Sequence, residues 1–195
     1  MPWSSMLRSF LSILCAGFVS LASLGAWAAA AVPLAELAKP GRVLMLRHAN
    51  APGNGDPSGF TLGDCTTQRN LDQAGRAQAV ALGERLAQAG VARARVYSSQ
   101  WCRCVETARL LNLGVVETLP ALNSFYPRPQ QREPTIAALR AFLAGLPRDG
   151  APVVLVTHQF TINEFTGEGT VSGGGSVFEL NGSGAPRLLG AIEAN

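Results

Sequence analysis

The apolar positions of this chain fall into blocks whose spacing predicts strands and helices in alternation. Apolar residues recur at helical spacing in segments 72–89, 101–111 and 135–146. Short apolar runs that predict strands lie at 42–46, 95–98, 115–116, 152–157, 176–180 and 187–192. This order favours an α/β fold, a three-layer α/β/α sandwich around a mostly parallel central sheet.

Polar residues stand where three of the predicted strands end. Arg47 and His48 follow the first strand, Ser99 and Arg103 follow the second, and His158 follows the run at 152–157. Parallel sheets bind ligands beyond the carboxyl ends of their strands, so we expect these side chains to meet at one edge. Two long loops rich in glycine and proline, 50–67 and 120–134, are expected to form the rim that selects the substrate.

These residue types suit phosphoryl transfer. An imidazole nitrogen is a competent nucleophile toward phosphorus, and arginines bind phosphoryl oxygens through two donors at once. A second imidazole, when protonated, stabilises charge in the transition state. A covalent phosphohistidine route requires no metal and no cofactor, and we predict neither.

Four stretches resemble the signatures of the histidine phosphatase superfamily, whose fold is called phosphoglycerate-mutase-like. "LMLRHA" is similar to the Arg-His-Gly motif, with Ala49 in place of glycine. "YSSQWCRCVETA" fits Ser-x-x-x-Arg-x-x-x-Thr-Ala through Ser99, Arg103, Thr107 and Ala108. "VVLVTH" fits the second histidine, and "NLDQAGRAQA" fits a helix motif through Leu71, Gly75, Gln78 and Ala79. The four lie in the family's order along the chain.

The resemblance implies a role for each residue at the sheet edge. His48 is the nucleophile that becomes phosphorylated, Arg47 and Arg103 hold the phosphoryl group, and His158 completes the pocket. Asn50 and Arg69 are further candidates for contact with the substrate.

One position departs from the family pattern. Many relatives carry a glutamate after the second motif that donates a proton to the leaving group, whereas this chain has Ser124 there. The proton donor is therefore unassigned at this stage; the candidates are Glu164, Glu133, Asp64 and Glu168. The missing glutamate argues against a mutase and favours hydrolysis.

The cysteines suggest one disulfide. Cys102 and Cys104 are too close on one helical turn to pair with each other, so we expect Cys65 to pair with one of them. A zinc site is the alternative, although its ligand spacing is poor. The segments "GDCTTQRNLD", "SSQWCRCVETARLL" and "THQFTINEFTG" further resemble an exported branch that includes lipopolysaccharide core heptose phosphate phosphatases. As a hypothesis, a Cys65–Cys102 bond would clip the first loop to the second helix.

The N-terminal segment predicts export. Arg8 is the only charge in the first thirty residues, residues 10–24 are apolar or small, and Ala-Trp-Ala at 26–28 is typical of signal peptidase sites. We expect a signal peptide at 1–28, cleaved after Ala28 or Ala30, followed by a catalytic domain at 32–195. A membrane anchor is the alternative, but the apolar stretch is short. The periplasm or the exterior is the expected location.

Net charge limits the kinds of partner. Loss of Arg8 lowers the formal charge of +3 by one, which is too weak to favour nucleic acid or a membrane surface. We expect a small-molecule or glycan phosphoester as substrate. A heptose phosphate, another sugar phosphate and a phosphoprotein all fit, and a phosphate-binding module without turnover and a phosphomutase remain alternative functions.

Overall fold

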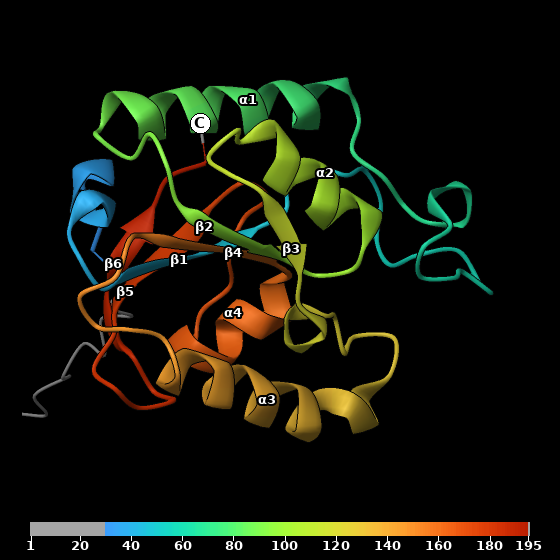
Figure 1. Cartoon of the computed structure of the whole chain (residues 1–195). Helices are drawn as coiled ribbons and strands as arrows, with labels where there is room; N and C mark the ends of the chain where they lie inside the picture. The colour runs from blue at the N-terminus through green and yellow to red at the C-terminus, as the bar shows by residue number, and fades with distance from the viewer. Residues whose placement is uncertain (1–29, 195) are drawn as a thin grey trace, which may run out of the picture.

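The computed structural model describes residues 30–194 and has the predicted three layers (Figure 1). The six strands lie in the order β3-β2-β4-β1-β5-β6. Their bounds are β1 Arg42–Arg47, β2 Arg95–Ser98, β3 Val116–Thr118, β4 Val153–Thr157, β5 Gly175–Glu179 and β6 Arg187–Ile192. The helices are α1 Gln73–Gln88, α2 Cys102–Leu110, α3 Arg132–Ala144 and α4 Gln159–Thr166, with short 3-10 turns η1 Leu34–Ala38, η2 Cys65–Thr67, η3 Pro120–Leu122 and η4 Pro129–Gln131. Helices α1 and α2 cover one face of the sheet, and α3 and α4 cover the other.

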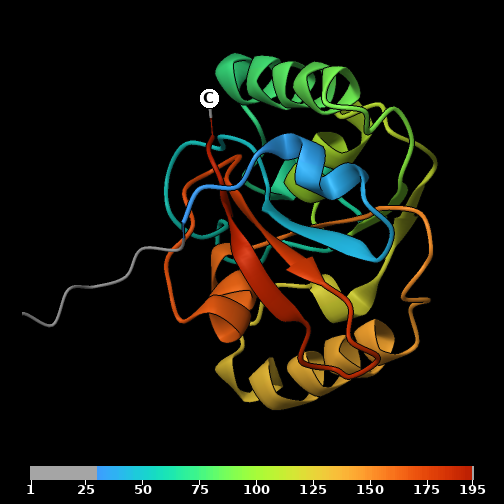
Figure 2. The ribbon, with the colours of Figure 1, turned by 90° about the vertical axis from the view of Figure 1, so that its left-hand side faces the viewer.

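The sheet is mostly parallel, as predicted. Strands β3, β2, β4 and β1 run in one direction, while β5 is antiparallel to both β1 and β6. Figure 2 looks onto the β5–β6 edge. The central strands read as unbroken apolar runs because both of their faces are buried. In β1, Leu44 and Leu46 pack under α1 and α2, while Val43 and Met45 pack toward α3.

Two helical features differ from the sequence prediction. Helix α3 begins at Arg132, not at residue 135, because Pro134 lies in its first turn, where the backbone N–H would have no partner within the helix. Helix α4 was not predicted. It is eight residues long, has only two buried side chains, and ends at Gly167 in the left-handed conformation, so its periodic signal is weak.

The expected signal segment lies outside the described residues. Within residues 30–194, no helix combines the length and apolar character needed to cross a membrane.

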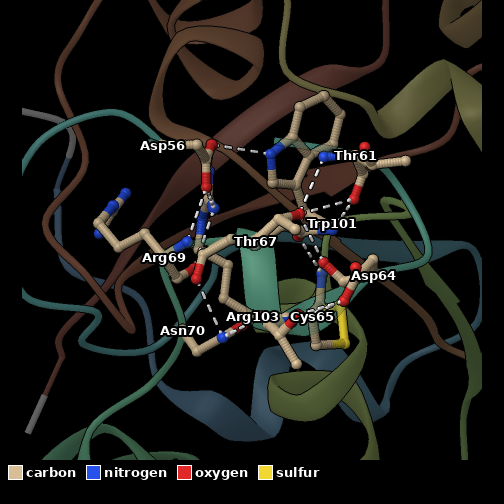
Figure 3. Close-up of a disulfide and its surroundings, with 12 residues drawn as sticks. Asp56, Thr61, Asp64, Cys65, Thr67, Arg69, Asn70, Trp101 and Arg103 are labelled. Atoms are coloured by element: carbon tan, nitrogen blue, oxygen red, sulfur yellow. Dashed lines mark hydrogen bonds and ion pairs between the residues drawn. A yellow bond between two sulfur atoms is a disulfide. The ribbon is translucent and has the colours of Figure 1, made fainter. Parts of the chain in front are cut away.

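One disulfide joins Cys65 to Cys102, and Cys104 stays free and buried (Figure 3). The pairing resolves the choice left open by the sequence and excludes a zinc site built on these two thiolates. The bond fastens η2, in the first long loop, to the start of α2. Beside it, the Gln68 side chain accepts a hydrogen bond from the Cys102 N–H at 3.0 Å.

We expect removal of the disulfide to lower the free energy of unfolding by about 3–4 kcal/mol, since the bond closes a long loop in the unfolded chain. The closed loop has a sequence separation of 37. Urea denaturation of Cys65→Ser/Cys102→Ser, compared with wild type, measures this loss. The double variant should also be insensitive to dithiothreitol. A variant as stable as wild type would contradict the prediction.

Candidate active site

His48 directly follows β1 and is only 2% exposed. Its N–H donates to the Thr157 carbonyl of β4 at 3.0 Å, so the pairing of the two strands fixes its place. Its Nδ1 lies 2.8 Å from the carbonyl oxygen of Ala49. That oxygen only accepts hydrogen bonds, so Nδ1 carries the proton. The Nε2 lone pair is therefore available as a nucleophile.

Helices α1 and α2 hold the turn after His48. The Ala49 N–H donates to the Thr107 hydroxyl, and the Asn50 N–H donates to the Gln78 side chain, each at 3.0 Å. Gly75 lets α1 approach this turn, because a β-carbon there would lie 2.0 Å from the Asn50 carbonyl oxygen. Thr107, Gln78 and Gly75, all from the motifs quoted above, thus hold the backbone that follows His48.

His158 follows β4 and faces His48, with ring centroids 5.6 Å apart. Its Nε2 lies 2.9 Å from the Ser99 hydroxyl, which lies 3.2 Å from the Asn123 side-chain oxygen. The hydroxyl also accepts a hydrogen bond from the Trp101 backbone N–H at 3.3 Å, and its three contacts are satisfied when His158 donates to Ser99 and Ser99 donates to Asn123. The predicted convergence of the two histidines is present in the structure.

Three arginines surround the histidines. Arg47 donates to the Thr170 carbonyl at 2.6 Å, and Arg69 donates through Nε to the Gly55 carbonyl at 2.8 Å. Arg103 is 4% exposed. Among the described residues, the Nε–H groups of Arg47 and Arg103 are buried without a hydrogen-bond partner. Unpaired buried donors beside positive charge favour an anionic ligand, such as a phosphoryl group.

Burial keeps both imidazoles neutral. It lowers the pKa of His48 to about 3; the hydrogen bond to Ala49 opposes this shift, and the charges of Arg103, Arg69 and Arg47 add to it. Burial is also the main reason why the pKa of His158 lies well below its ordinary value, and the charges of His48 and of the same three arginines lower it further. His158 is therefore neutral in the free protein, and the protonated imidazole that the sequence analysis considers for the transition state stays a prediction. Its protonation requires a bound anion.

These pKa shifts make stability depend on pH. Histidine titrates near 6.5 in an unfolded chain, so below that pH the unfolded state binds protons that the folded state excludes. The stability due to neutral His48 is complete above pH 6.5 and is lost as pH falls toward its folded pKa of about 3. Each histidine contributes a slope of up to about 1.4 kcal/mol per pH unit. Urea denaturation between pH 7.5 and pH 5 should give this loss, and His48→Asn should reduce the slope. An equal slope in both proteins would contradict it.

The two candidate substrate ligands have different surroundings. Arg69 lies in the arginine group and depresses the pKa of both histidines. The Asn50 side-chain amide donates to Asp72, the N-cap residue of α1, at 3.0 Å. Contact with a substrate remains a prediction for both residues.

Three of the four candidate proton donors have carboxylates that bind other partners: Glu164, Glu133 and Asp64. Glu164 and Glu133 both pair with Arg132, at 2.6 and 2.5 Å. Asp64 caps η2 through the Thr66 N–H at 3.0 Å. Glu168 lies in the turn after α4, where its N–H donates to the Thr166 hydroxyl.

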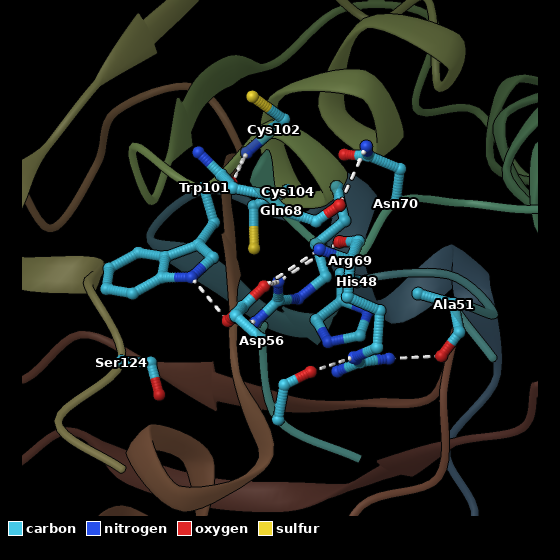
Figure 4. Close-up of polar contacts among 12 residues, drawn as sticks. His48, Ala51, Asp56, Gln68, Arg69, Asn70, Trp101, Cys102, Cys104 and Ser124 are labelled. Carbon is cyan, nitrogen blue, oxygen red and sulfur yellow. Dashed lines mark hydrogen bonds and ion pairs between the residues drawn. The ribbon is translucent and has the colours of Figure 1, made fainter. Parts of the chain in front are cut away.

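Asp56 brings a carboxylate into the pocket, and sequence reasoning missed this residue. Its side chain is 5% exposed and pairs with Arg103 at 2.7 Å. Figure 4 shows it between Arg69 and the Trp101 indole. The position lies in an irregular loop that resembles no family motif, so no sequence signal distinguishes it from the other loop aspartates.

A groove of about 650 Å³ begins at Trp101, beside the arginine group. The walls come from both long loops and from α3: Phe60, Thr61, Leu62, Pro120, Ala121, Asn123, Ser124, Pro127, Arg128, Gln131, Pro134, Thr135 and Ala138. Most of these side chains are apolar. The loops predicted to select the substrate thus line the groove next to the histidines.

Comparison with known proteins agrees with this geometry. Residues 43–125 match the model of the histidine phosphatase superfamily (branch 1). No match was found among curated protein sequences.

Several solved structures share the fold. The protein histidine phosphatase SixA complexed with tungstate is 21% identical, with a TM-score of 0.57 over 78% of this chain and 97% of that one. A mycobacterial glucosyl-3-phosphoglycerate phosphatase in complex with VO3 is 20% identical, with a TM-score of 0.55 over 75% and 95%. A putative phosphohistidine phosphatase SixA from Nakamurella multipartitia is 18% identical, with a TM-score of 0.54 over 78% and 95%. At these identities the likeness concerns the fold.

Proposed function

The chain belongs to the histidine phosphatase superfamily, and from this membership we propose that it is a metal-independent phosphomonoesterase that works through a phosphohistidine on His48. The observation that carries the proposal is the tautomer of His48. Its Nδ1 proton is held by the Ala49 carbonyl, which leaves Nε2 free beside three guanidinium groups.

The reaction has two steps. The Nε2 lone pair of His48 forms a bond to phosphorus, and the bond to the leaving oxygen breaks with its electron pair. Water then attacks the phosphohistidine and releases phosphate. Arg47 and Arg103 hold the phosphoryl oxygens, and His158 stabilises the charge that develops on them.

We propose an exported phosphoester as substrate, with a sugar phosphate of the cell envelope as the leading class. The disulfide supports an oxidising compartment. The apolar groove supports an organic leaving group larger than the phosphoryl group alone.

The proposal is tested by assaying p-nitrophenyl phosphate in the presence of EDTA. We expect release of inorganic phosphate at a rate that EDTA leaves unchanged. A protein that binds vanadate yet hydrolyses no phosphoester would be a phosphate-binding module. Isomerised product in place of free phosphate, with a phosphosugar as substrate, would indicate a mutase.

The groove is tested by Ala138→Trp, which fills it from the exposed side of α3. We expect kcat/KM for 4-methylumbelliferyl phosphate to fall by about tenfold or more, while that for the small acetyl phosphate is kept. Ala137→Trp is the matched control, since the neighbouring Ala137 is exposed and does not line the groove. Equal losses of kcat/KM on both substrates would show that the groove does not bind the leaving group.

A further inference from the structure

The Asp56 carboxylate receives four hydrogen bonds inside the active-site pocket. Arg103 donates through Nη1 at 2.7 Å and through Nη2 at 3.2 Å, each to a different carboxylate oxygen. The Trp101 indole N–H donates at 2.9 Å, and the Arg69 backbone N–H donates at 3.0 Å. Asp56 thus binds a guanidinium as a phosphoryl group would, through two parallel bonds.

This arrangement makes Asp56 a competitor of the substrate. Both terminal nitrogens of Arg103 are occupied by the carboxylate, while its Nε–H is buried and unpaired. A phosphoryl group that binds Arg103 end-on, through both terminal nitrogens, takes the two donors that Asp56 holds and displaces it. The displaced carboxylate loses its cation and comes to lie beside a second anion, and a nearby negative charge favours its protonated form.

Asp56 also lies toward the leaving group. Trp101, which holds its carboxylate, forms the first wall of the apolar groove. In Figure 4, Trp101 and Ser124 lie on one side of Asp56 and His48 lies on the other. In-line attack by His48 sends the leaving oxygen away from the imidazole, toward this side.

We propose that Asp56 is the proton donor of the reaction, held on Arg103 in the free protein and released from it by the phosphoester. The inference rests on the proposed phosphatase function. It fills the role for which the family position offers only Ser124, and it uses a loop different from the one that carries that position.

The protons balance through the cycle. The ester enters as its monoanion. Its acidic proton moves to Asp56 when the phosphoryl oxygens accept the hydrogen bonds of Arg103. His48 Nε2 bonds to phosphorus, the P–O bond breaks, and the leaving oxygen takes its electron pair and the Asp56 proton. Water then attacks phosphorus and gives a proton to Asp56, while the N–P electron pair returns to His48. Phosphate leaves with that proton, and the carboxylate returns to Arg103.

The test compares Asp56→Asn with wild type on two esters. Phenyl phosphate has a poor leaving group that needs a proton, whereas 2,4-dinitrophenyl phosphate has a good one. We expect kcat/KM to fall by about 10²–10³-fold on phenyl phosphate and by less than about tenfold on the dinitrophenyl ester. Inhibition by vanadate should be as strong as in wild type or stronger, because the competing carboxylate is gone. Asp56→Glu should recover part of the activity on phenyl phosphate.

Asp64→Asn is the matched control in the same loop and should behave as wild type on both esters. Equal losses of Asp56→Asn on the two esters, with weaker vanadate inhibition, would overturn the proposal, because Asp56 would then only position Arg103. A wild-type protein inactive on both esters would instead refute the proposed function.

A second measurement does not depend on the folding of the variant. With a proton donor in place, wild-type kcat/KM should differ by less than about tenfold between the two esters. A difference on the order of 10³-fold or more in an active wild type would overturn the proposal.

Discussion

Replacement of His48 by asparagine is expected to lower kcat/KM for p-nitrophenyl phosphate by at least about 10⁴-fold, a loss typical of removing a covalent nucleophile. The asparagine amide can still donate to the Ala49 carbonyl, as Nδ1 does at 2.8 Å, so the turn keeps its hydrogen bond. The change removes Nε2, the atom that is proposed to form the bond to phosphorus. Loss of activity is therefore expected without loss of the fold.

Two measurements check this expectation. Steady-state assays give the rate, and rapid quenching with radiolabelled substrate detects an acid-labile, alkali-stable phosphoprotein in wild type only. His158→Asn is the informative companion, because it removes charge stabilisation but not the nucleophile. It should lose about 10²–10³-fold in rate and still form the phosphoprotein. More than about 1% residual activity in His48→Asn would contradict the assignment.

Replacement of Arg103 by methionine is expected to reduce both activity and stability. The guanidinium that is proposed to hold the phosphoryl group is lost, and kcat/KM should fall by about 10³-fold. The buried partner Asp56 also loses its counter-ion. Breaking a buried ion pair from one side typically costs about 3–5 kcal/mol, because an uncompensated charge remains.

A double-mutant cycle separates these two effects. Asp56→Asn added to Arg103→Met removes the unpaired charge, so the double variant should be more stable than Arg103→Met while remaining inactive. Urea denaturation of the four proteins measures the coupling. Additive losses of stability would show that the ion pair at 2.7 Å contributes little.

The same pair predicts a pH dependence. Burial raises the pKa of Asp56, but the hydrogen bonds and charge of Arg103 outweigh it, and the net pKa is below its usual value. The stability from this pair is therefore present above the unfolded pKa of about 3.9 and is lost as pH falls through the folded pKa. In Arg103→Met the uncompensated carboxyl is buried with a raised pKa, so its penalty is relieved at low pH. The difference in the free energy of unfolding between wild type and Arg103→Met should therefore become smaller as the pH is lowered from 7 to 4, which urea denaturation at both pH values measures.

The part of the site that lies at the ends of strands could be predicted from the sequence. The ends of β1 and β4 are readable because both strands are unbroken apolar runs followed by histidine, and the sheet's register then brings His48 and His158 together. The sequence also predicted a disulfide from Cys65 to this helical turn, but it left Cys102 and Cys104 as alternatives, and the structure selects Cys102.

The parts that depend on loop conformation could not be predicted. Asp56 contacts Arg103 across 47 positions of sequence, and no periodic pattern records such a contact. The groove at Trp101 likewise joins residues from two loops and from α3. The start of α3 was missed because the prolines at 127, 129 and 134 indicate a loop, although the last of them lies within the first helical turn.

The backbone bond between His48 and Thr157 has a consequence for motion. Amides in the ladder of a doubly buried sheet open to hydrogen exchange only in rare, near-global fluctuations, whereas surface loops open often. We therefore expect the His48 amide to exchange among the slowest in the molecule, and the amides of the loops that line the groove to exchange faster. We accordingly expect the rim of the groove to open locally for a bulky ester while the two imidazole rings keep their spacing of 5.6 Å.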